Sequence, residues 1–206
     1  MPVTPVDKIQ YRVMTLADLP GVPIACQGPL PDVRSRIREL GSTSVLAFDA
    51  GQHVAQLQFR RYDRLLRSPN GLWDPLYWGD FGDAAPDLPV RTLSLFCYHV
   101  GQLDDSERRD ITYQGRGIGV RLLEFLIGWA KEAGFEALVA KGTPNVRSVA
   151  SFMGGLPGNL YVDRGFALTT SWVDPQLRKV IQERGLIPAD GDLDEAARVS
   201  CCVRQL

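Results

Sequence analysis

The sequence predicts an α/β fold in one domain, and three observations carry this prediction. Segments rich in β-branched and aromatic residues alternate with segments that show the 3.6-residue apolar period of helices. The chain has 206 residues, of which 45% are hydrophobic and 23% charged, enough to bury a sizeable core. No internal repeat or low-complexity segment is evident. We therefore expect a single domain over residues 1–206, with insertions.

The early part of the chain predicts a strand, a helix and a hairpin, which we place at residues 9–16, 31–40 and 42–60. Pro31 lies in the first turn of that helix and Gly41 follows its last turn, where each residue type is favoured. Asp49-Ala50-Gly51-Gln52 separates two apolar segments and is a hairpin signal.

Residues 68–89 hold Pro, Gly and Asp together with Trp73, Tyr77, Trp78 and Phe81, without a regular period. This composition predicts a long irregular loop, and loops of this length are usually functional or disordered. The aromatic residues argue against disorder.

The second half predicts alternating strands and helices. Strands are expected at 90–100, 135–141, 166–172 and 198–204, and helices at 117–133, 145–152, 159–164 and 175–184. Asn159 suits the cap of its short helix and Gly165 its end. The polar stretch 101–110 is interpreted as an insertion, and residues 173–197 as a helical insertion before the last strand.

Composition narrows the function classes. A net charge of −1 argues against a protein that coats nucleic acid. Residues 1–8 lack a secretory layout and no apolar run is long enough for a bilayer, so we expect a cytoplasmic protein without membrane contact. Four cysteines do not suggest a disulfide framework, and two histidines show no metal-ligand spacing. We therefore expect reduced thiols and no metal.

Residues 113–119, Tyr-Gln-Gly-Arg-Gly-Ile-Gly, directly precede the helix at 117–133. Alternate glycines let backbone N–H groups converge, and the helix adds unpaired donors and its positive end, so the loop suits a phosphate group. A Walker loop fails because Val120-Arg121 follows the last glycine, and a dinucleotide fingerprint lacks its third glycine. A glycine-rich turn without a ligand stays open on these residues alone.

Two motifs together resemble one family. Gln114-Gly115-Arg116-Gly117-Ile118-Gly119 resembles the acetyl-CoA signature of the GNAT family of N-acetyltransferases, Gln/Arg-x-x-Gly-x-Gly/Ala. Leu160–Phe166 is similar to the family's second stretch, a Tyr followed four residues later by Gly-Phe. The resemblance covers about residues 90–206. Two features depart from it: the insertion 101–110 lengthens the connection to the glycine loop, and Gly154–Gly158 interrupts the helix before Tyr161.

The resemblance implies a mixed, mostly antiparallel sheet with a V-shaped splay between the strands at 90–100 and 135–141, flanked by helices. It also implies acetyl-CoA as co-substrate, without metal. The cofactor-binding residues that it implies are Tyr98, Val100, Gln114, Gly115, Arg116, Gly117, Ile118, Gly119 and Asn159. Arg116 could equally be an exposed arginine.

The reaction that the resemblance implies is direct attack of an amine on the thioester. Tyr161 would act as general acid to the departing CoA thiolate, and a backbone N–H near His99 or Val100 would donate to the oxyanion. His99 is a candidate base, although a lone histidine in a strand is more often structural. Asp74, Asp80 and Asp83 are alternatives to it.

The partners implied are acetyl-CoA and an amine of a small molecule or protein, with a homodimer possible and no nucleic acid. Residues 71–83 mix aromatic rings with carboxylates, which fits either a cationic acceptor or a lid packed on the core or a second subunit. A rival interpretation is an inactive acyl-CoA sensor or interaction domain, and a nicotinamide oxidoreductase is a distant third.

Overall fold

The computed structural model describes residues 8–106 and 108–206. The chain divides into two compact units, the first of Met1–Arg61 with Phe96–Ala133 and the second of Tyr62–Leu95 with Gly134–Leu206. The stretch that argued against a secretory signal falls largely on residues 1–7, outside the described residues. No helix within the described ranges is long and apolar enough to span a bilayer.

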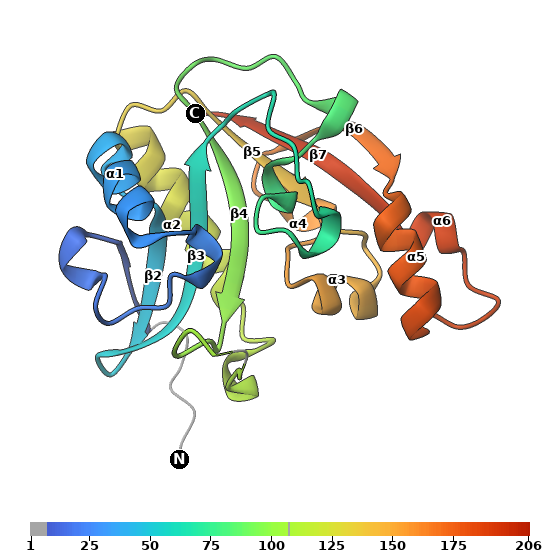
Figure 1. Cartoon of the computed structure of the whole chain (residues 1–206), viewed down its shortest axis with the longest axis horizontal. Coiled ribbons are helices and arrows are strands. Elements are labelled where there is room, and N and C mark those ends of the chain that lie inside the picture. The colour runs from blue at the N-terminus through green and yellow to red at the C-terminus, as the bar shows by residue number, and fades with distance from the viewer. Residues whose placement is uncertain (1–7, 107) are drawn as a thin grey trace. The chain divides into compact units, whose positions relative to one another are not determined.

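The strands of the described residues form one seven-stranded sheet in the order β1-β2-β3-β4-β5-β7-β6 (Figure 1). Strand β4, Thr92–Val100, runs parallel to β5, Ala137–Gly142, whereas the pairs β1–β2, β2–β3, β5–β7 and β6–β7 are antiparallel. The parallel register joins only Thr92–Ser94 to Ala137–Val139, as the predicted splay requires. The predicted class, a mostly antiparallel sheet flanked by helices, is confirmed.

The first unit contains β1 (Gln10–Val13), the short 3-10 turn η3 (Ala25–Gln27), α1 (Leu30–Leu40), β2 (Ser44–Asp49), β3 (Gln52–Arg61), the later part of β4, the 3-10 turn η7 (Ile111–Tyr113) and α2 (Ile118–Glu132). The turn between β2 and β3 consists of Ala50 and Gly51, both with positive φ, as a two-residue hairpin of type I′ requires. This confirms the hairpin predicted from Asp49-Ala50-Gly51-Gln52.

Helices cover both faces of the first unit's strands. Leu46 of β2 packs in one cluster with Val33 and Ile37 of α1. Because side chains alternate across a strand, its neighbours point to the other face, where α2 packs on β2 and β3. There the rings of Phe59 and Trp129 lie 5.3 Å apart. Figure 1 shows α1 and α2 beside these strands.

The second unit contains the 3-10 turns η4 (Gly71–Trp73), η5 (Tyr77–Gly79) and η6 (Gly82–Ala84), the start of β4, β5, α3 (Arg147–Met153), α4 (Gly158–Val162), β6 (Ala167–Val173), α5 (Pro175–Arg184), α6 (Leu193–Ala196) and β7 (Arg198–Gln205). The predicted elements are present with ends shifted by a few residues. Val90, predicted to start a strand, is 78% exposed and lies before β4.

The two faces of β5 and β7 in the second unit have different covers. Phe81 of the loop 68–89 packs with Val139 and Cys201 on one face. Helix α4 lies on the opposite face, where a Cβ added to Gly142 would stand 2.9 Å from the Cα of Gly158. The loop predicted to be irregular is therefore an ordered lid on the sheet.

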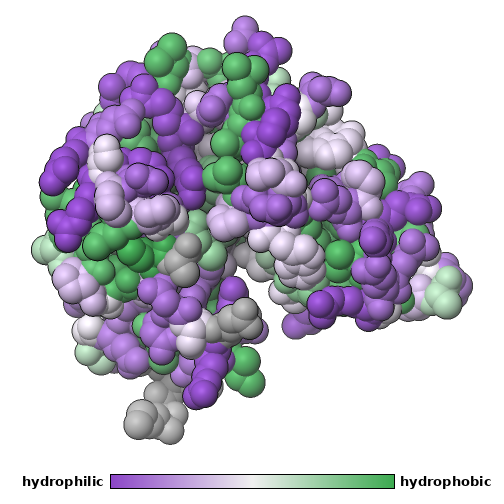
Figure 2. All heavy atoms as spheres, viewed as in Figure 1, coloured by the Kyte–Doolittle hydropathy of each residue, from purple (hydrophilic) through white to green (hydrophobic). Residues whose placement is uncertain are grey.

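The surface is of the usual mixed kind. On the face drawn in Figure 2, hydrophilic residues are interspersed with smaller apolar patches. Such a mixture is normal for a folded protein, because apolar atoms make up much of any protein surface.

Candidate functional site

The glycine loop connects η7 to α2 in the first unit. Gly115 has φ +70° and Gly117, the N-cap of α2, has φ +79°. L-residues rarely adopt these left-handed values, so the backbone itself demands glycine at both positions. A Cβ at either position would meet nothing within 4 Å. The space beside the loop is therefore open.

The start of α2 carries backbone donors that the helix does not use. No side chain caps Gly117, and the first pairing across it is the N–H of Arg121 to the Gly117 carbonyl, at 3.1 Å. The N–H groups of Ile118, Gly119 and Val120 therefore have no carbonyl partner within the helix. Together with the positive helix end, they suit an anion such as a pyrophosphate.

Arg116 adds a charge to the same loop. Its guanidinium lies 5.4 Å from the ring centroid of Tyr113, whose hydroxyl donates to Asp49 Oδ2 at 3.1 Å. Burial, followed by that hydrogen bond, raises the pKa of Tyr113. The buried Nη2 of Arg116 has no hydrogen-bond partner among the described residues. An anion bound at the loop would satisfy it.

The insertion 101–110 closes on itself. The Asp110 N–H donates to the Gly101 carbonyl at 2.8 Å, and Gly101 has φ +81°. A Cβ on Gly101 would stand 2.2 Å from the Asp110 carbonyl oxygen. Because its two ends meet, the insertion adds residues but little distance between the end of β4 and η7, which precedes the glycine loop.

The predicted residues of β4 differ in burial. Tyr98 and His99 are each 6% exposed, and Val100 is half-buried. His99 lies beside Cys97 of the same strand and Cys26 of η3, with one ligand atom of each within 4.8 Å of the others. The hydrogen bond between the two thiols lowers the pKa of Cys26 and raises that of Cys97. The candidate base His99 therefore lies next to the paired thiols of Cys26 and Cys97.

Tyr161 lies in α4 of the second unit and is 2% exposed. Its ring meets that of Phe166 edge-on, with centroids 5.1 Å apart. Hydrogen bonds hold the start of α4 to the end of β5, from the Gly158 N–H to the Thr143 carbonyl at 3.1 Å and from the Thr143 N–H to the Leu156 carbonyl at 3.0 Å. These hydrogen bonds fix the position of α4, and so of Tyr161, relative to β5.

Asn159 does not cap the helix, contrary to the sequence prediction. Helix α4 begins at Gly158, and its N-cap is Pro157. Asn159 lies inside the first turn, where its Oδ1 accepts from the Leu160 N–H at 2.9 Å. Pro157 can occupy the position before the first turn because the fixed φ of proline suits the entry to a helix. The predicted contact of Asn159 with acetyl-CoA stays a prediction.

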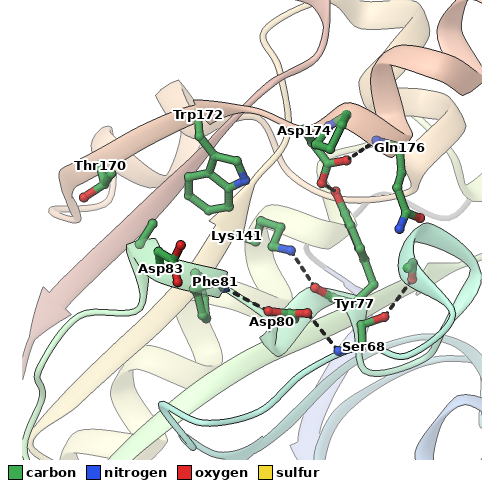
Figure 3. A pocket seen from close by; sticks show the side chains of 14 residues that line it. Ser68, Tyr77, Asp80, Phe81, Asp83, Lys141, Thr170, Trp172, Asp174 and Gln176 are labelled. Atoms are coloured by element: carbon green, nitrogen blue, oxygen red, sulfur yellow. Dashed lines mark hydrogen bonds between the residues drawn. The ribbon is translucent and has the colours of Figure 1, made fainter.

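A pocket of about 560 Å³ in the second unit surrounds a lysine that sequence reasoning missed (Figure 3). Lys141 is 4% exposed, and its Nζ donates to the Tyr77 carbonyl at 2.7 Å. The same Nζ stands 3.8 Å from the Tyr77 ring centroid and 5.8 Å from that of Trp172. The Tyr77 hydroxyl donates to Asp174 Oδ2 at 2.7 Å.

This arrangement bears on the aromatic loop at 71–83. Its rings were interpreted as either a cage for a cationic acceptor or a lid on the core. Tyr77 and Phe81 instead surround the chain's own ammonium group, with Asp80 and Asp174 adding favourable charge. The structure therefore favours the lid. The sequence did carry a signal for this lysine. Lys141 lies at the end of an apolar strand, two residues after Val139, and therefore on the same buried face.

Burial lowers the pKa of Lys141 to about 8 from 10.5. Between these values the unfolded chain binds more protons than the folded chain at this site, so stability rises with pH. We expect the wild-type free energy of unfolding to gain about 1 kcal/mol from pH 7 to pH 9 relative to Lys141→Met. Urea unfolding at both pH values measures this gain.

The matched control for this prediction is Lys179→Met, because Lys179 is exposed on α5, where its Nζ lies 3.7 Å from Glu183 Oε1. Its free energy of unfolding should follow the wild type across the same pH range. Equal pH profiles for wild type and Lys141→Met would show that Lys141 keeps an ordinary pKa in the folded protein.

Comparison with known proteins identifies part of the chain. The model of the acetyltransferase (GNAT) family matches residues 110–154, which span the glycine loop, α2 and β5. No curated protein matches at a significant level. The match confirms the resemblance carried by Gln114–Gly119.

Three solved structures are similar to the chain. The ribosomal-protein-S18-alanine N-acetyltransferase from Escherichia coli is 15% identical, with 96% of this chain and 93% of that chain covered and a TM-score of 0.49. An acetyltransferase of the GNAT family from Streptococcus pneumoniae is 15% identical, with 96% of this chain and 99% of that chain covered and a TM-score of 0.49. A GNAT family acetyltransferase from Elizabethkingia anophelis with acetyl-CoA bound is 15% identical, with 97% of this chain and 99% of that chain covered and a TM-score of 0.47. Similarity at this level says nothing of this chain's substrate. Residues 110–154 of this chain therefore match the model of the GNAT acetyltransferase family.

Proposed function

We propose that the protein is an acetyl-CoA-dependent N-acetyltransferase, which moves an acetyl group from the CoA thioester to an amine of a small molecule or protein. The observation that carries the proposal is the uncapped, glycine-rich start of α2 within the segment that the family model matches. Its unused N–H groups are the chemical complement of a diphosphate.

In this proposal the amides of Gly115–Gly119 hold the pyrophosphate, whereas the Gln114 N–H donates to the Ile111 carbonyl at 3.0 Å. Arg116 donates its Nη2 to a phosphate oxygen. The backbone of Tyr98 and Val100 binds the pantetheine arm as an added strand would, and Asn159 contributes a polar contact. Fixed backbone dipoles need no reordering when the ligand arrives, which favours tight binding.

The proposed reaction is a direct transfer. The neutral amine attacks the thioester carbonyl, a C–N bond forms, and the C–S bond breaks as the tetrahedral oxyanion collapses. A backbone N–H near His99 or Val100 stabilises that oxyanion. The amine's proton passes to a base, for which His99 is the candidate, and the CoA thiolate takes a proton from Tyr161.

The proposal is tested by release of free CoA from acetyl-CoA across a panel of primary amines, including peptides with a free N-terminus. We expect turnover above the hydrolysis background with at least one class of amine. Binding of acetyl-CoA without turnover of any amine would instead favour the catalytically inactive sensor. No binding of acetyl-CoA at all would contradict both.

We also propose that the protein acts in the cytoplasm. Cys26, Cys97, Cys201 and Cys202 are all free, although Cys26 and Cys97 lie close to each other. Thiols in such positions stay reduced in the cytoplasm, where acetyl-CoA is also available to an enzyme.

A further inference from the structure

Three soft metal-ligand side chains meet in the first unit. Cys26 lies on η3, whereas Cys97 and His99 are two residues apart on β4 and so point to the same face of that strand. One ligand atom of each lies within 4.8 Å of the other two. Nothing in the glycine-loop proposal uses the two thiols.

The buried imidazole of His99 adds a third metal-ligating group to the two thiols. His99 is 6% exposed; its ring interacts with the Cys26 thiol, and neither ring nitrogen has another hydrogen-bond partner among the described residues. A buried polar group without such a partner is unfavourable, so it calls for a ligand that the nitrogen can bind. A cation beside the two sulfurs would satisfy it.

The spacing of the three atoms fits a tetrahedral cation after a small contraction. Zn–S bonds of about 2.3 Å and Zn–N bonds of about 2.0 Å place neighbouring ligand atoms roughly 3.5–3.8 Å apart. The observed limit of 4.8 Å is about 1 Å longer. Thiolate and imidazole donors select thiophilic metals over Mg²⁺ or Ca²⁺.

The backbone that carries the donors is held from several sides. Next to Cys26, the Gln27 side chain donates to Ser44 Oγ at 2.8 Å. The Ile24 N–H donates to Asp105 Oδ1 at 2.9 Å, which ties the insertion 101–110 to the same segment. The donors therefore start near their final positions, and binding requires little reordering.

Arg60 holds the segment that carries Cys26. Its guanidinium donates to the carbonyls of Cys26 and Gln27, each at 3.2 Å. A metal ion displaces the protons of the thiols that bind it, so two thiolates would balance the charge of a divalent cation.

We propose that Cys26 Sγ, Cys97 Sγ and one ring nitrogen of His99 bind a single thiophilic divalent cation such as Zn²⁺, with water in the fourth position. This goes against the sequence expectation of no metal. Spacing rules find ligands that are close in sequence, whereas this site joins a turn near residue 26 to a strand near residue 98. The cation and the proposed base role both use His99, so an occupied site would withdraw that base.

The test is a titration of the reduced full-length protein with Co²⁺, followed through the thiolate-to-cobalt charge-transfer absorption. We expect one equivalent to bind and Zn²⁺ to displace it. Cys26→Ser and Cys97→Ser should each abolish the absorption band. His99→Gln should retain a weaker band. Its affinity for Co²⁺ should fall by more than roughly 10–100-fold, which is the cost of losing a residue that only supports a metal ligand.

Cys202→Ser is the matched control, because Cys202 is a buried thiol of the second unit. It should bind Co²⁺ as the wild type does. Thermal unfolding provides a second measurement for variants that fold poorly: at one Zn²⁺ concentration, the Tm of wild type and Cys202→Ser should rise more than the Tm of His99→Gln.

Three results would overturn the proposal: no absorption band in the reduced wild type, unchanged binding in both Cys26→Ser and Cys97→Ser, or loss of binding in Cys202→Ser. If the reduced wild type shows no absorption band and hydrogen peroxide forms a disulfide between Cys26 and Cys97, these two cysteines would be assigned to redox chemistry instead. Because these measurements read the cation directly, they are independent of acetyl transfer.

Discussion

Gly117→Val is expected to weaken acetyl-CoA binding by about 10- to 100-fold while the chain remains folded. At φ +79° a β-branched residue is strained by about 1–3 kcal/mol, so the N-cap would shift to an extended conformation and turn the first amides of α2 away from the ligand. The added side chain would also occupy the open space beside the loop. Isothermal titration with acetyl-CoA measures the loss.

Gly128→Ala is the control for this prediction. Gly128 lies in the exposed middle of the same helix, its φ is ordinary, and an added Cβ meets nothing within 4 Å. Alanine there should stabilise α2 by about 0.5–1 kcal/mol and leave affinity unchanged. Wild-type affinity in Gly117→Val, with this control intact, would show that the loop does not face the cofactor.

The parts of the fold that could be predicted are those with a local cause. The apolar period places α2 at 117–133, and the structure has it at Ile118–Glu132. The turn at Ala50 and Gly51 was predictable because a two-residue hairpin needs residues that tolerate positive φ. Periodicity and backbone sterics act over a few residues, which a sequence displays directly.

The features that escaped prediction depend on distant segments. Cys26 and His99 meet because η3 packs beside β4, and no spacing rule connects them. Lys141 is buried because the loop 68–89 folds over β5 and supplies the Tyr77 carbonyl. Asn159 loses the cap position because Pro157, one residue before α4, takes it. Tertiary packing decided each of these.

Tyr161→Phe is expected to lower kcat by about 10²- to 10⁴-fold and to leave the affinity for acetyl-CoA unchanged. A positioned general acid contributes an effect of that size, and phenylalanine removes only the hydroxyl that would protonate the thiolate. The ring is buried against Phe166, so the variant keeps the packing of α4. Single-turnover rates with an active amine, together with titration of acetyl-CoA, separate the two effects.

Tyr62→Phe is the matched control, since it removes a tyrosine hydroxyl from the same unit, one that donates to the Pro86 carbonyl at 2.7 Å. It should keep wild-type kcat, and any change should appear in stability alone. A Tyr161→Phe enzyme with wild-type kcat would remove Tyr161 from the mechanism and leave the thiolate to be protonated by water. A loss of affinity without a loss of kcat would make the hydroxyl a binding group, because an interaction made equally in the ground and transition states changes binding and not the chemical step.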